Sequence, residues 1–432
     1  MINKRDNDLF ELINQELERQ QNGLEMIASE NYVSKNVLKA MGSILTNKYS
    51  EGYPGQRYYG GNEFIDQIEN LGREYTKKIF QVDHANLQPY SGSPANQAVY
   101  FALCEPGDKI MGMNLLYGGH LTHGWKVNFS ARFYKSIQYT TDKNGWLDYD
   151  AIQALVHKEK PKLVFVGATA YSRIIDFEKL AQIAHVENAF LIADIAHIAG
   201  LIAVGLHPSP SKHADVITTT THKTLRGPRG AMILCDGEKS NPIKKPEPAI
   251  GWRESKQNIP TYIDRAVFPG LQGGPHNQTT AGITQALFEV QQPEFKKYAE
   301  QIIKNAQTLA KELMNAGLKI ITGGTDNHMI LIDISPFKIS GAEAETALEK
   351  AMIAVNKNTI PFDPRSPFDP SGIRIGTPAL TSRGMKEDEM KQIGQMIIKV
   401  LKNHQKEETL NQTKKQVKDL CDKFPLYSDL SY

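Results

Sequence analysis

The chain has 432 residues, which is enough for two or three domains and for a core that needs no disulfide or metal ion to be stable. Its 50 basic side chains nearly balance 48 acidic ones, and a net charge of +2 argues against a protein dedicated to nucleic acid or a membrane surface, though not against a small cationic site. The cysteines, Cys104, Cys235 and Cys421, are odd in number and form no CxxC motif. We therefore expect a reducing compartment and no zinc or iron–sulfur framework.

The N-terminal residues predict a helix rather than a targeting segment. Apolar side chains recur at helical spacing over 9–25, where we expect an amphipathic arm. No apolar leader precedes it, and its acidic side chains are untypical of a mitochondrial presequence, so we expect a cytoplasmic protein.

Short apolar strands alternate with helices from about residue 85 to 235. Strands are predicted at 109–113, 133–139, 162–170, 189–194 and 215–221. A helix capped by Asp176 is predicted over 176–188. Near-continuous apolar strands joined by helices predict a mostly parallel sheet covered on both faces. In such sheets ligands bind beyond the carboxyl ends of the strands.

One segment, 189–206, is apolar and nearly long enough to cross a bilayer, which takes about 20 residues. Asp194, His197 and two glycines interrupt it. An ionised aspartate in hydrocarbon costs roughly 2.5–3.5 kcal/mol. We therefore interpret the segment as a buried strand that ends at Asp194, and we expect no transmembrane helix.

The C-terminal part predicts a second, smaller domain. Its expected elements are one or two long helices over 278–316, a half-exposed strand at 328–334, a helix at 341–354, a proline-rich loop at 360–372 and helix from about 386 onward. The predicted organisation is an N-terminal helical arm (1–25), a large α/β domain (26–280) and a small C-terminal α+β domain (281–432).

The segment 90–96 resembles a phosphate-binding helix start. Ser93 suits an N-cap and Pro94 a first helical position. Ser91, Gly92 and Ser93 would then offer hydroxyls and free N–H groups at a positive helix end. On this motif alone a plain capped turn is the favoured explanation, and neither a Walker A motif nor GxGxxG is present.

A run of threonines leads to Lys223 in the segment 216–230. Buried hydroxyls need partners, so four successive threonines are unusual in a purely structural strand. Nearby cations, including Arg226 and Arg229, and partial burial would lower the pKa of Lys223, as an amine nucleophile requires. A solvated basic loop would explain the arginines but not the threonines.

Asp194 ends the strand at 189–194, where it could cap a helix, pair with a cation or hold a protonated ring nitrogen. A lysine and an aspartate at strand ends, together with a Ser/Gly helix start, match the requirements of pyridoxal phosphate.

Other candidate residues fit an amino-acid substrate. Arg374, in a short strand bounded by glycines, suits an anion clamp, although a structural ion pair is an alternative. His120 and His123 could suggest a metal site, but no carboxylate or cysteine is near them in sequence, so we expect no metal and a stacking or hydrogen-bonding role for His120. Glu51 lies in a Tyr- and Gly-rich segment that is either a hinged surface loop or a proton-transfer site.

These motifs resemble the serine hydroxymethyltransferase family over essentially the whole chain. The segments that carry the resemblance are IASENY (27–32), NKYSEGYPGQRYYGG (47–61), SGSPAN (91–96), GGHLTHG (118–124), DIAHIAGL (194–201), TTTTHKTLRGPRG (218–230), FPGLQGGPH (268–276), NKNTIP (356–361) and SPFDPSGIRIGTPA (366–379). Nine ordered matches make a chance resemblance implausible.

The resemblance implies the fold and the reaction. The fold would be fold-type I of the pyridoxal-phosphate-dependent transferases, which is aspartate-aminotransferase-like. The reaction would interconvert L-serine plus tetrahydrofolate with glycine plus 5,10-methylenetetrahydrofolate, through an external aldimine and a quinonoid. A homodimer with shared active sites is implied. The alternatives are a folate-independent aldolase of β-hydroxy amino acids, or a binding protein that kept the fold without catalysis.

The resemblance also implies how the cofactor is held. Lys223 would bind it covalently, Asp194 would pair with the pyridinium nitrogen, His120 would stack on the ring, and His197 would hydrogen-bond near the phenolic oxygen. Further cofactor contacts would be Ser91, Gly92 and Ser93 at the phosphate, Thr169 with a hydroxyl in place of a common serine, and Tyr49, Gly273 and Gly274 of the neighbouring subunit.

The substrate contacts follow in the same way. Arg374 and Ser29 would hold the substrate carboxylate, and Glu51 would transfer protons with Tyr58 and Tyr59 close by. His222 matches a residue tied to reaction specificity. The positions that match folate contacts are Leu115, Gly119, Leu121, Asn358, Ser366, Pro367 and Phe368. Asp369-Pro370 departs from the usual Val-Thr of this folate-side loop.

Overall fold

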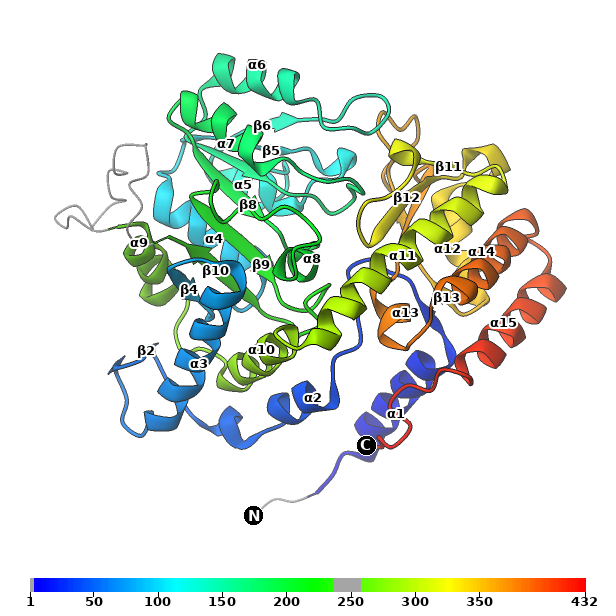
Figure 1. The fold of residues 1–432 in the computed structure, drawn as a ribbon, viewed down its shortest axis with the longest axis horizontal. Coiled ribbons are helices and arrows are strands. Elements are labelled where there is room, and N and C mark those ends of the chain that lie inside the picture. Colours follow the sequence, from blue (N-terminus) through cyan, green and yellow to red (C-terminus); the bar gives the residue numbers. More distant parts are fainter. Residues whose placement is uncertain (1–3, 237–257) are drawn as a thin grey trace. The chain divides into compact units, whose positions relative to one another are not determined.

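The computed structural model describes residues 4–236 and 258–432 (Figure 1). The chain divides into two compact units, a large one comprising Val33–Glu300 and a small one comprising Met1–Tyr32 with Gln301–Tyr432. The division therefore falls after the predicted domain limits at 25 and 280. The N-terminal arm and the short segment that follows it belong with the C-terminal residues.

A seven-stranded sheet forms the centre of the large unit (Figure 1). Its strands, in spatial order, are β4 (His84–Asn86), β10 (Ala231–Cys235), β9 (Val216–Thr220), β8 (Phe190–Asp194), β7 (Leu163–Val166), β5 (Lys109–Met113) and β6 (Lys135–Tyr139). The five predicted strands are confirmed as β5 to β9, and they are mutually parallel. Only β10 runs antiparallel to its neighbours β9 and β4.

Both faces of this sheet are buried, as the apolar strand sequences predict. Alternate residues of β8 show this: Leu191 and Ala193 join one apolar cluster, while Phe190 and Ile192 join another. The first cluster includes residues of α3 (Glu63–Phe80), α6 (Tyr149–Glu159), α7 (Phe177–Val186) and α10 (Asn277–Val290). The second includes residues of α4 (Gly92–Leu103) and α9 (Ile259–Arg265). Asp176 caps α7 by accepting from the N–H of Lys179, which confirms that prediction.

The carboxyl ends of β8 and β9 lie at one edge of the sheet, because Asp194 pairs in register with Thr218. The apolar segment 189–206 is split between β8 and the short helix α8 (Ala199–Ala203). In the described part of the chain, no helix combines the length and the apolar character needed to span a membrane. The parallel arrangement thus sets Asp194 and the residues after β9 side by side.

The small unit is built on a four-stranded antiparallel sheet. Its strands, in spatial order, are β11 (Lys319–Ile320), β12 (Met329–Asp333), β15 (Gly372–Gly376) and β14 (Asn356–Asn358). The longer helices with residues in this unit are α1 (Asn7–Asn22), α11 (Pro293–Asn315), α12 (Gly341–Lys350), α14 (Glu387–Lys402) and α15 (Glu407–Cys421). The remaining α-helices and short strands of the two units are α2 (Lys35–Met41), α5 (Phe129–Phe133), α13 (Pro378–Ser382), β1 (Leu24–Glu25), β2 (Gly52–Tyr53), β3 (Gln56–Arg57) and β13 (Ile353–Ala354).

Two predictions about the small unit are wrong in detail. The strand at 328–334 was expected to be half exposed, but all five residues of β12 are buried, since it is an inner strand between β11 and β15. The helix predicted over 341–354 ends at Lys350. Ile353 and Ala354 instead form β13, which pairs in parallel with β1.

Glu25, in β1, is a buried carboxyl that titrates far from its ordinary range. The residue is 5% exposed, and its Oε1 accepts from the N–H of Ile27 at 3.1 Å. Burial, followed by the charge of Glu30, raises the pKa of Glu25 to about 8, although Arg19 lies 3.6 Å away. The folded chain therefore keeps a proton that the unfolded chain releases, so this group's contribution to stability is lost as pH rises from about 4.5 through 8.

Replacing Glu25 with glutamine is expected to remove that loss. Chemical denaturation should give similar free energies of unfolding for the variant and the parent near pH 5. By pH 8.5 we expect the variant to be the more stable by roughly 2–4 kcal/mol, because it carries no buried charge. Glu18→Gln, on the exposed face of α1, is the control and should show no such pH dependence. A constant difference across pH would contradict the prediction.

Candidate active site

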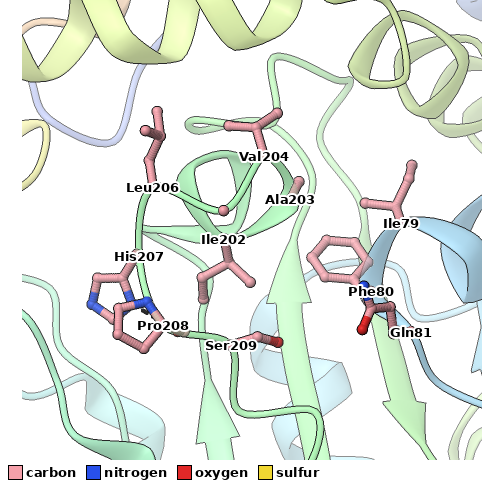
Figure 2. Close-up of a pocket in the computed structure, with 11 residues that line it drawn as sticks. Ile79, Phe80, Gln81, Ile202, Ala203, Val204, Leu206, His207, Pro208 and Ser209 are labelled. Carbon is pink, nitrogen blue, oxygen red and sulfur yellow. Dashed lines mark hydrogen bonds between the residues drawn. The ribbon is translucent and has the colours of Figure 1, made fainter.

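The site is defined by the sheet edge rather than by the cavity that lies between α3 and α8 (Figure 2). That cavity, of about 680 Å³, lies between residues 79–81 at the end of α3 and residues 202–209 at the end of α8 and just after it. None of the predicted site residues lines it. The predicted residues form two groups, one in each unit, and each group is described in turn.

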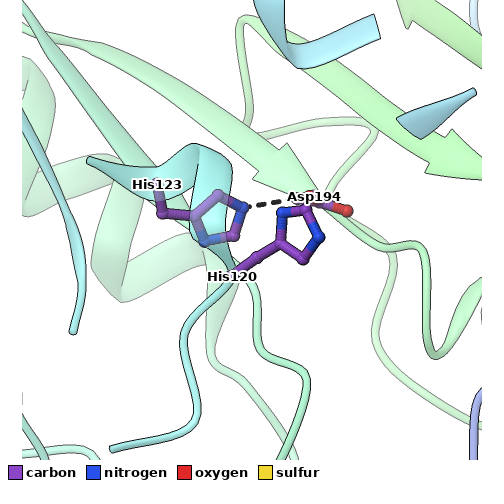
Figure 3. A group of neighbouring side chains, drawn as sticks. All are labelled: His120, His123 and Asp194. Carbon is purple, nitrogen blue, oxygen red and sulfur yellow. Dashed lines mark hydrogen bonds and ion pairs between the residues drawn. The ribbon is translucent and has the colours of Figure 1, made fainter. Parts of the chain in front are cut away.

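Asp194 lies at the centre of a hydrogen-bonded group at the end of β8 (Figure 3). Its Oδ2 accepts from Asn96 Nδ2 at 2.9 Å and from His123 Nε2 at 3.0 Å, and its Oδ1 accepts from the N–H of Ala196 at 3.1 Å. Burial by itself would raise the pKa of Asp194, but the hydrogen bond and charge of His123 hold that pKa well below its usual range. The carboxylate is therefore ionised, and Oδ1 retains the capacity to accept from a ligand N–H.

His123 is a further residue of this group, and its sequence motif predicts no role for it. Its ring is 1% exposed and stacks on Phe165 at 5.0 Å. An ionised carboxylate can only accept, so Nε2 carries the hydrogen that is shared with Asp194. His123 follows β5, and Asp194 ends β8, so parallel strands bring together residues that are 71 positions apart. The only sequence signal for this contact was the second histidine of the motif GGHLTHG.

His120 is held as a neutral ring. Its Nδ1 accepts from the N–H of Thr122 at 3.3 Å and lies 2.7 Å from Thr122 Oγ1. Burial, with smaller contributions from His123 and Lys223, lowers the pKa of His120 to about 4. A neutral, partly buried imidazole suits stacking against an aromatic ligand.

The same side chains have the composition of a metal site, which corrects one step of the sequence argument. We expected no metal because no carboxylate is near the two histidines in sequence, yet donor atoms of His120, His123 and Asp194 lie within 4.8 Å of one another (Figure 3). The 3.0 Å separation between His123 and Asp194 is that of an ordinary N–H···O hydrogen bond. Hydrogen bonding alone therefore accounts for the arrangement.

Lys223 follows β9 and is positioned by the threonine run. Its Nζ donates to Thr220 Oγ1 at 2.8 Å. Thr219 donates to the carbonyl of Thr220 at 2.8 Å, and Thr221 donates to the carbonyl of Pro228 at 2.6 Å. The expected hydroxyl partners are thus present for these three threonines, whereas Thr218 Oγ1 is buried with no hydrogen-bond partner among the described residues.

The candidate phosphate site adjoins the strand that leads to Lys223. A Cβ atom on Gly92 would lie 2.7 Å from Thr220 Cγ2, so only glycine fits there without displacing the threonine. The helix α4 begins at Gly92 with Ser91 as its N-cap, not at Ser93 and Pro94 as predicted. The Ser91 side chain makes no capping bond, so a plain capped turn does not explain it, and the first-turn N–H groups of Gly92 and Ser93 have no helical acceptor.

His222 lies close to two cations, Lys223 and Arg229. Burial, followed by the charges of Lys223 and Arg229, lowers the pKa of His222 to about 3. His222 is therefore neutral near pH 7. His197 is buried, and its carbonyl accepts from Thr224 Oγ1 at 2.8 Å. The loop after Lys223 is in this way fastened to the loop after Asp194.

The loop that carries His120 is held by Thr169. The Thr169 hydroxyl donates to the carbonyl of Gly119 at 2.8 Å, and its N–H donates to the carbonyl of Gly118 at 2.7 Å. A Cβ atom on Gly119 would collide with the carbonyl of Met113, so that position requires glycine. Two expected folate contacts, Leu115 and Leu121, lie in short 3₁₀ turns on either side of this loop.

A second cluster in the large unit surrounds Glu51. Its Oε1 accepts from Tyr49 Oη at 3.2 Å, and the rings of Tyr49 and Tyr59 meet edge to face at 5.1 Å. Cβ atoms on Gly273 and Gly274 would lie 2.9 Å from Glu51 Oε1 and 3.1 Å from Tyr49 Cζ, respectively. These five predicted residues therefore converge.

The Glu51 cluster is tied to the segment that precedes the candidate phosphate site. Tyr90 Oη donates to the carbonyl of Gly274 at 2.8 Å. Tyr58 lies at the edge of the cluster, 74% exposed, with its ring 5.7 Å from that of Phe268.

In the small unit, Arg374 is the candidate carboxylate ligand. It lies on β15, its Nε donates to Asn356 Oδ1 at 3.0 Å, and burial lowers the pKa of the guanidinium to about 10. Ser29 lies in the turn from Ile27 to Glu30, which packs near the end of β15, because a Cβ atom on Gly376 would lie 2.6 Å from Ala28 Cα. Ser29 and Arg374 thus occupy adjoining segments of this unit.

The expected folate-side loop also belongs to the small unit. Asn358 ends β14, and its Nδ2 donates to the carbonyl of Thr359 at 2.7 Å. Ser366 and Pro367 precede Phe368, whose side chain is 87% exposed. Asp369, the departure from the family pattern, pairs with Arg365 at 3.0 Å. The aspartate therefore closes the turn that presents Phe368.

Comparison with known proteins identifies one family. The family model of serine hydroxymethyltransferase matches residues 2–397. Curated relatives named serine hydroxymethyltransferase include those of Mycoplasma capricolum, 51% identical over all of both chains, and Mycoplasma mycoides, 52% identical over 98% of both. A relative of the same name from Acidothermus cellulolyticus is 53% identical over 91% of this chain and 88% of its own.

Proposed function

The chain belongs to the serine hydroxymethyltransferase family, and from this membership we propose that it interconverts serine plus tetrahydrofolate with glycine plus 5,10-methylenetetrahydrofolate. It is a pyridoxal-phosphate-dependent enzyme of fold-type I, with tetrahydrofolate as co-substrate. The observation that carries the proposal is the meeting of an ionised Asp194, the amine of Lys223 and the start of α4 at one sheet edge.

These residues fit pyridoxal phosphate. Asp194 Oδ1 would accept from the ring N–H, Lys223 Nζ would bond the cofactor carbonyl carbon, and Ser91, Gly92 and Ser93 would bind the phosphate. When bound, the cofactor supplies the electron sink that bond cleavage at Cα of an amino acid requires. The neutral ring of His120 suits stacking on the cofactor. Thr169 positions the loop that carries His120.

The remaining predicted residues would bind substrate and move protons. Arg374 and Ser29 would hold the amino-acid carboxylate, since a buried guanidinium is the strongest carboxylate partner among side chains. Glu51, with Tyr49 and Tyr59 at its side, would give or take the proton of the hydroxymethyl group.

The predicted oligomeric state and the predicted cellular location are part of the same proposal. A homodimer with shared active sites is supported by the exposed aromatic side chains of Tyr58, Tyr59 and Phe64, which are close together in sequence, because exposed apolar surface marks interfaces. A cytoplasmic location is supported by the free, buried thiols of all three cysteines. Light scattering of the purified protein tests the first, and fractionation of cells the second.

The reaction itself is tested by its dependence on folate. Purified protein loaded with pyridoxal phosphate should convert serine to glycine much faster when tetrahydrofolate is supplied. Equal rates without tetrahydrofolate would favour the folate-independent aldolase instead. A preparation that takes up no pyridoxal phosphate would favour a binding protein without catalysis.

A further inference from the structure

Arg57 makes an unusual set of contacts beneath the Glu51 cluster. Its guanidinium is 3% exposed and donates from Nη1 to two backbone carbonyls, those of Ser50 at 2.8 Å and Gly52 at 2.6 Å. These are the carbonyls on either side of Glu51. One buried cation therefore holds both neighbours of the candidate proton-transfer residue.

The other side of the guanidinium is anchored to α3. Nε donates to Asp66 Oδ1 at 2.8 Å and Nη2 donates to Glu69 Oε2 at 2.6 Å. Gln88 reinforces this anchor, because its Nε2 donates to Glu69 Oε1 at 2.9 Å and to the carbonyl of Gly52 at 3.0 Å. The planar guanidinium thus makes four contacts in fixed directions, to two backbone carbonyls and two carboxylates. A lysine could not replace it, because its ammonium group is a single point of charge.

The backbone of Glu51 has little freedom beyond these bonds. Its carbonyl accepts from the N–H of Tyr58 at 3.0 Å, and Gly52 adopts φ +97°, where a Cβ would collide with Gln56. The Ser50 side chain also bonds Asn277. By contrast, Tyr49 and Gly273 are the neighbours described at the Glu51 carboxylate itself. The position of the carboxylate is thus set mainly through its backbone.

We propose that Arg57 is a positioning residue for Glu51, which it fixes against α3 in the geometry that proton transfer requires. The inference rests on the proposed function, because it assigns Arg57 a part in the step that Glu51 would perform. A displacement of about 1 Å in a reacting group is enough to cost about a hundredfold in rate. Arg57 is not among the expected substrate or cofactor contacts, and its guanidinium is occupied by protein groups, so we expect its loss to act on kcat.

Arg57→Lys is the first test, because it keeps a charge for Asp66 and Glu69 but loses the fork. We expect kcat for serine with tetrahydrofolate to fall at least about tenfold, while the KM for serine stays within about threefold. Arg73→Lys is the matched control, since Arg73 lies on α3 and, like Arg57, donates to a backbone carbonyl, that of Ala85, away from this hairpin. The control should retain the parent kcat.

A double-mutant cycle separates positioning from a general structural role. If Arg57 acts through Glu51, then Arg57→Lys should have no further effect on kcat in a Glu51→Gln background. Should Arg57→Lys fail to fold, Arg57→Met with Glu69→Gln removes both buried charges together and can be measured in the same two backgrounds. If the parent protein has folate-dependent activity, either of two results would overturn the role of Arg57. One is that the kcat losses of Arg57→Lys and Glu51→Gln add, and the other is that kcat is unchanged in Arg57→Lys. Lack of that activity in the parent protein would refute the proposed function and this role with it.

Discussion

Replacing Lys223 with alanine is expected to lower kcat for serine with tetrahydrofolate by roughly 10³-fold or more, because no other amine could occupy its place. Lys223 Nζ is held 2.8 Å from Thr220 Oγ1, beside the start of α4, and that position follows from the parallel ends of β8 and β9. The loss should therefore come from chemistry rather than from folding.

Two measurements distinguish these causes. Borohydride reduction followed by peptide mass spectrometry should place the cofactor on the peptide that contains Lys223 in the parent protein, and on no lysine in the variant. The thermal midpoint of the cofactor-free protein should change little. Lys212→Ala, an exposed lysine that precedes β9, is the control and should keep both activity and labelling. Full activity in Lys223→Ala, with the label on another lysine, would refute the assignment.

The parallel sheet and its functional edge were predictable because each strand carries its own signal. Near-continuous apolar runs identified β5 to β9, and polar residues directly after two of these runs identified Asp194 and Lys223. Both signals are local in sequence. Because such strands are parallel, their carboxyl ends meet at one edge of the sheet, and this brings the two residues together. The small unit was less predictable, since the pairing of β1 with β13 joins residues more than 300 positions apart.

The details that sequence could not supply depend on tertiary contacts. Ser93-Pro94 is the stronger local start signal, yet α4 begins at Gly92, where glycine allows close contact with Thr220. The carboxylate partner of His123, Asp194, lies outside its own motif, so this role for His123 could be recognised only once β5 and β8 had been placed in one sheet. Arg57 likewise joins its hairpin to α3 through Asp66 and Glu69, and it also binds the backbone carbonyls of Ser50 and Gly52, which leave no mark in sequence.

Replacing Asp194 with asparagine is the second change with a large expected effect. Asparagine keeps the size of the side chain and can still bond Ala196, but it carries no charge to favour a protonated ring nitrogen. We expect kcat to fall by roughly 10²–10⁴-fold, in the range seen when a charged group that stabilises a reaction centre is removed. Bound pyridoxal phosphate should also dissociate more readily, and its visible absorbance during dialysis measures this.

The control must also remove a buried carboxylate that is paired with histidine. Asp215 provides one, because its Oδ2 lies 2.9 Å from His185 Nε2. Asp215 directly precedes β9, so it lies at the end of that strand opposite the candidate site. Asp215→Asn should reduce stability without a comparable loss of kcat in the protein that folds.

The pKa of Asp194 is held below its usual range, so its ionised form adds stability that is present above about pH 4 and is lost as pH falls further. Asp194→Asn should therefore lose stability at pH 7 as well, so the two variants should differ in catalysis and in retention of pyridoxal phosphate rather than in loss of stability. If Asp194→Asn kept a kcat within severalfold of the parent, the ring nitrogen would need another partner, and the cofactor would have to be oriented differently at this sheet edge.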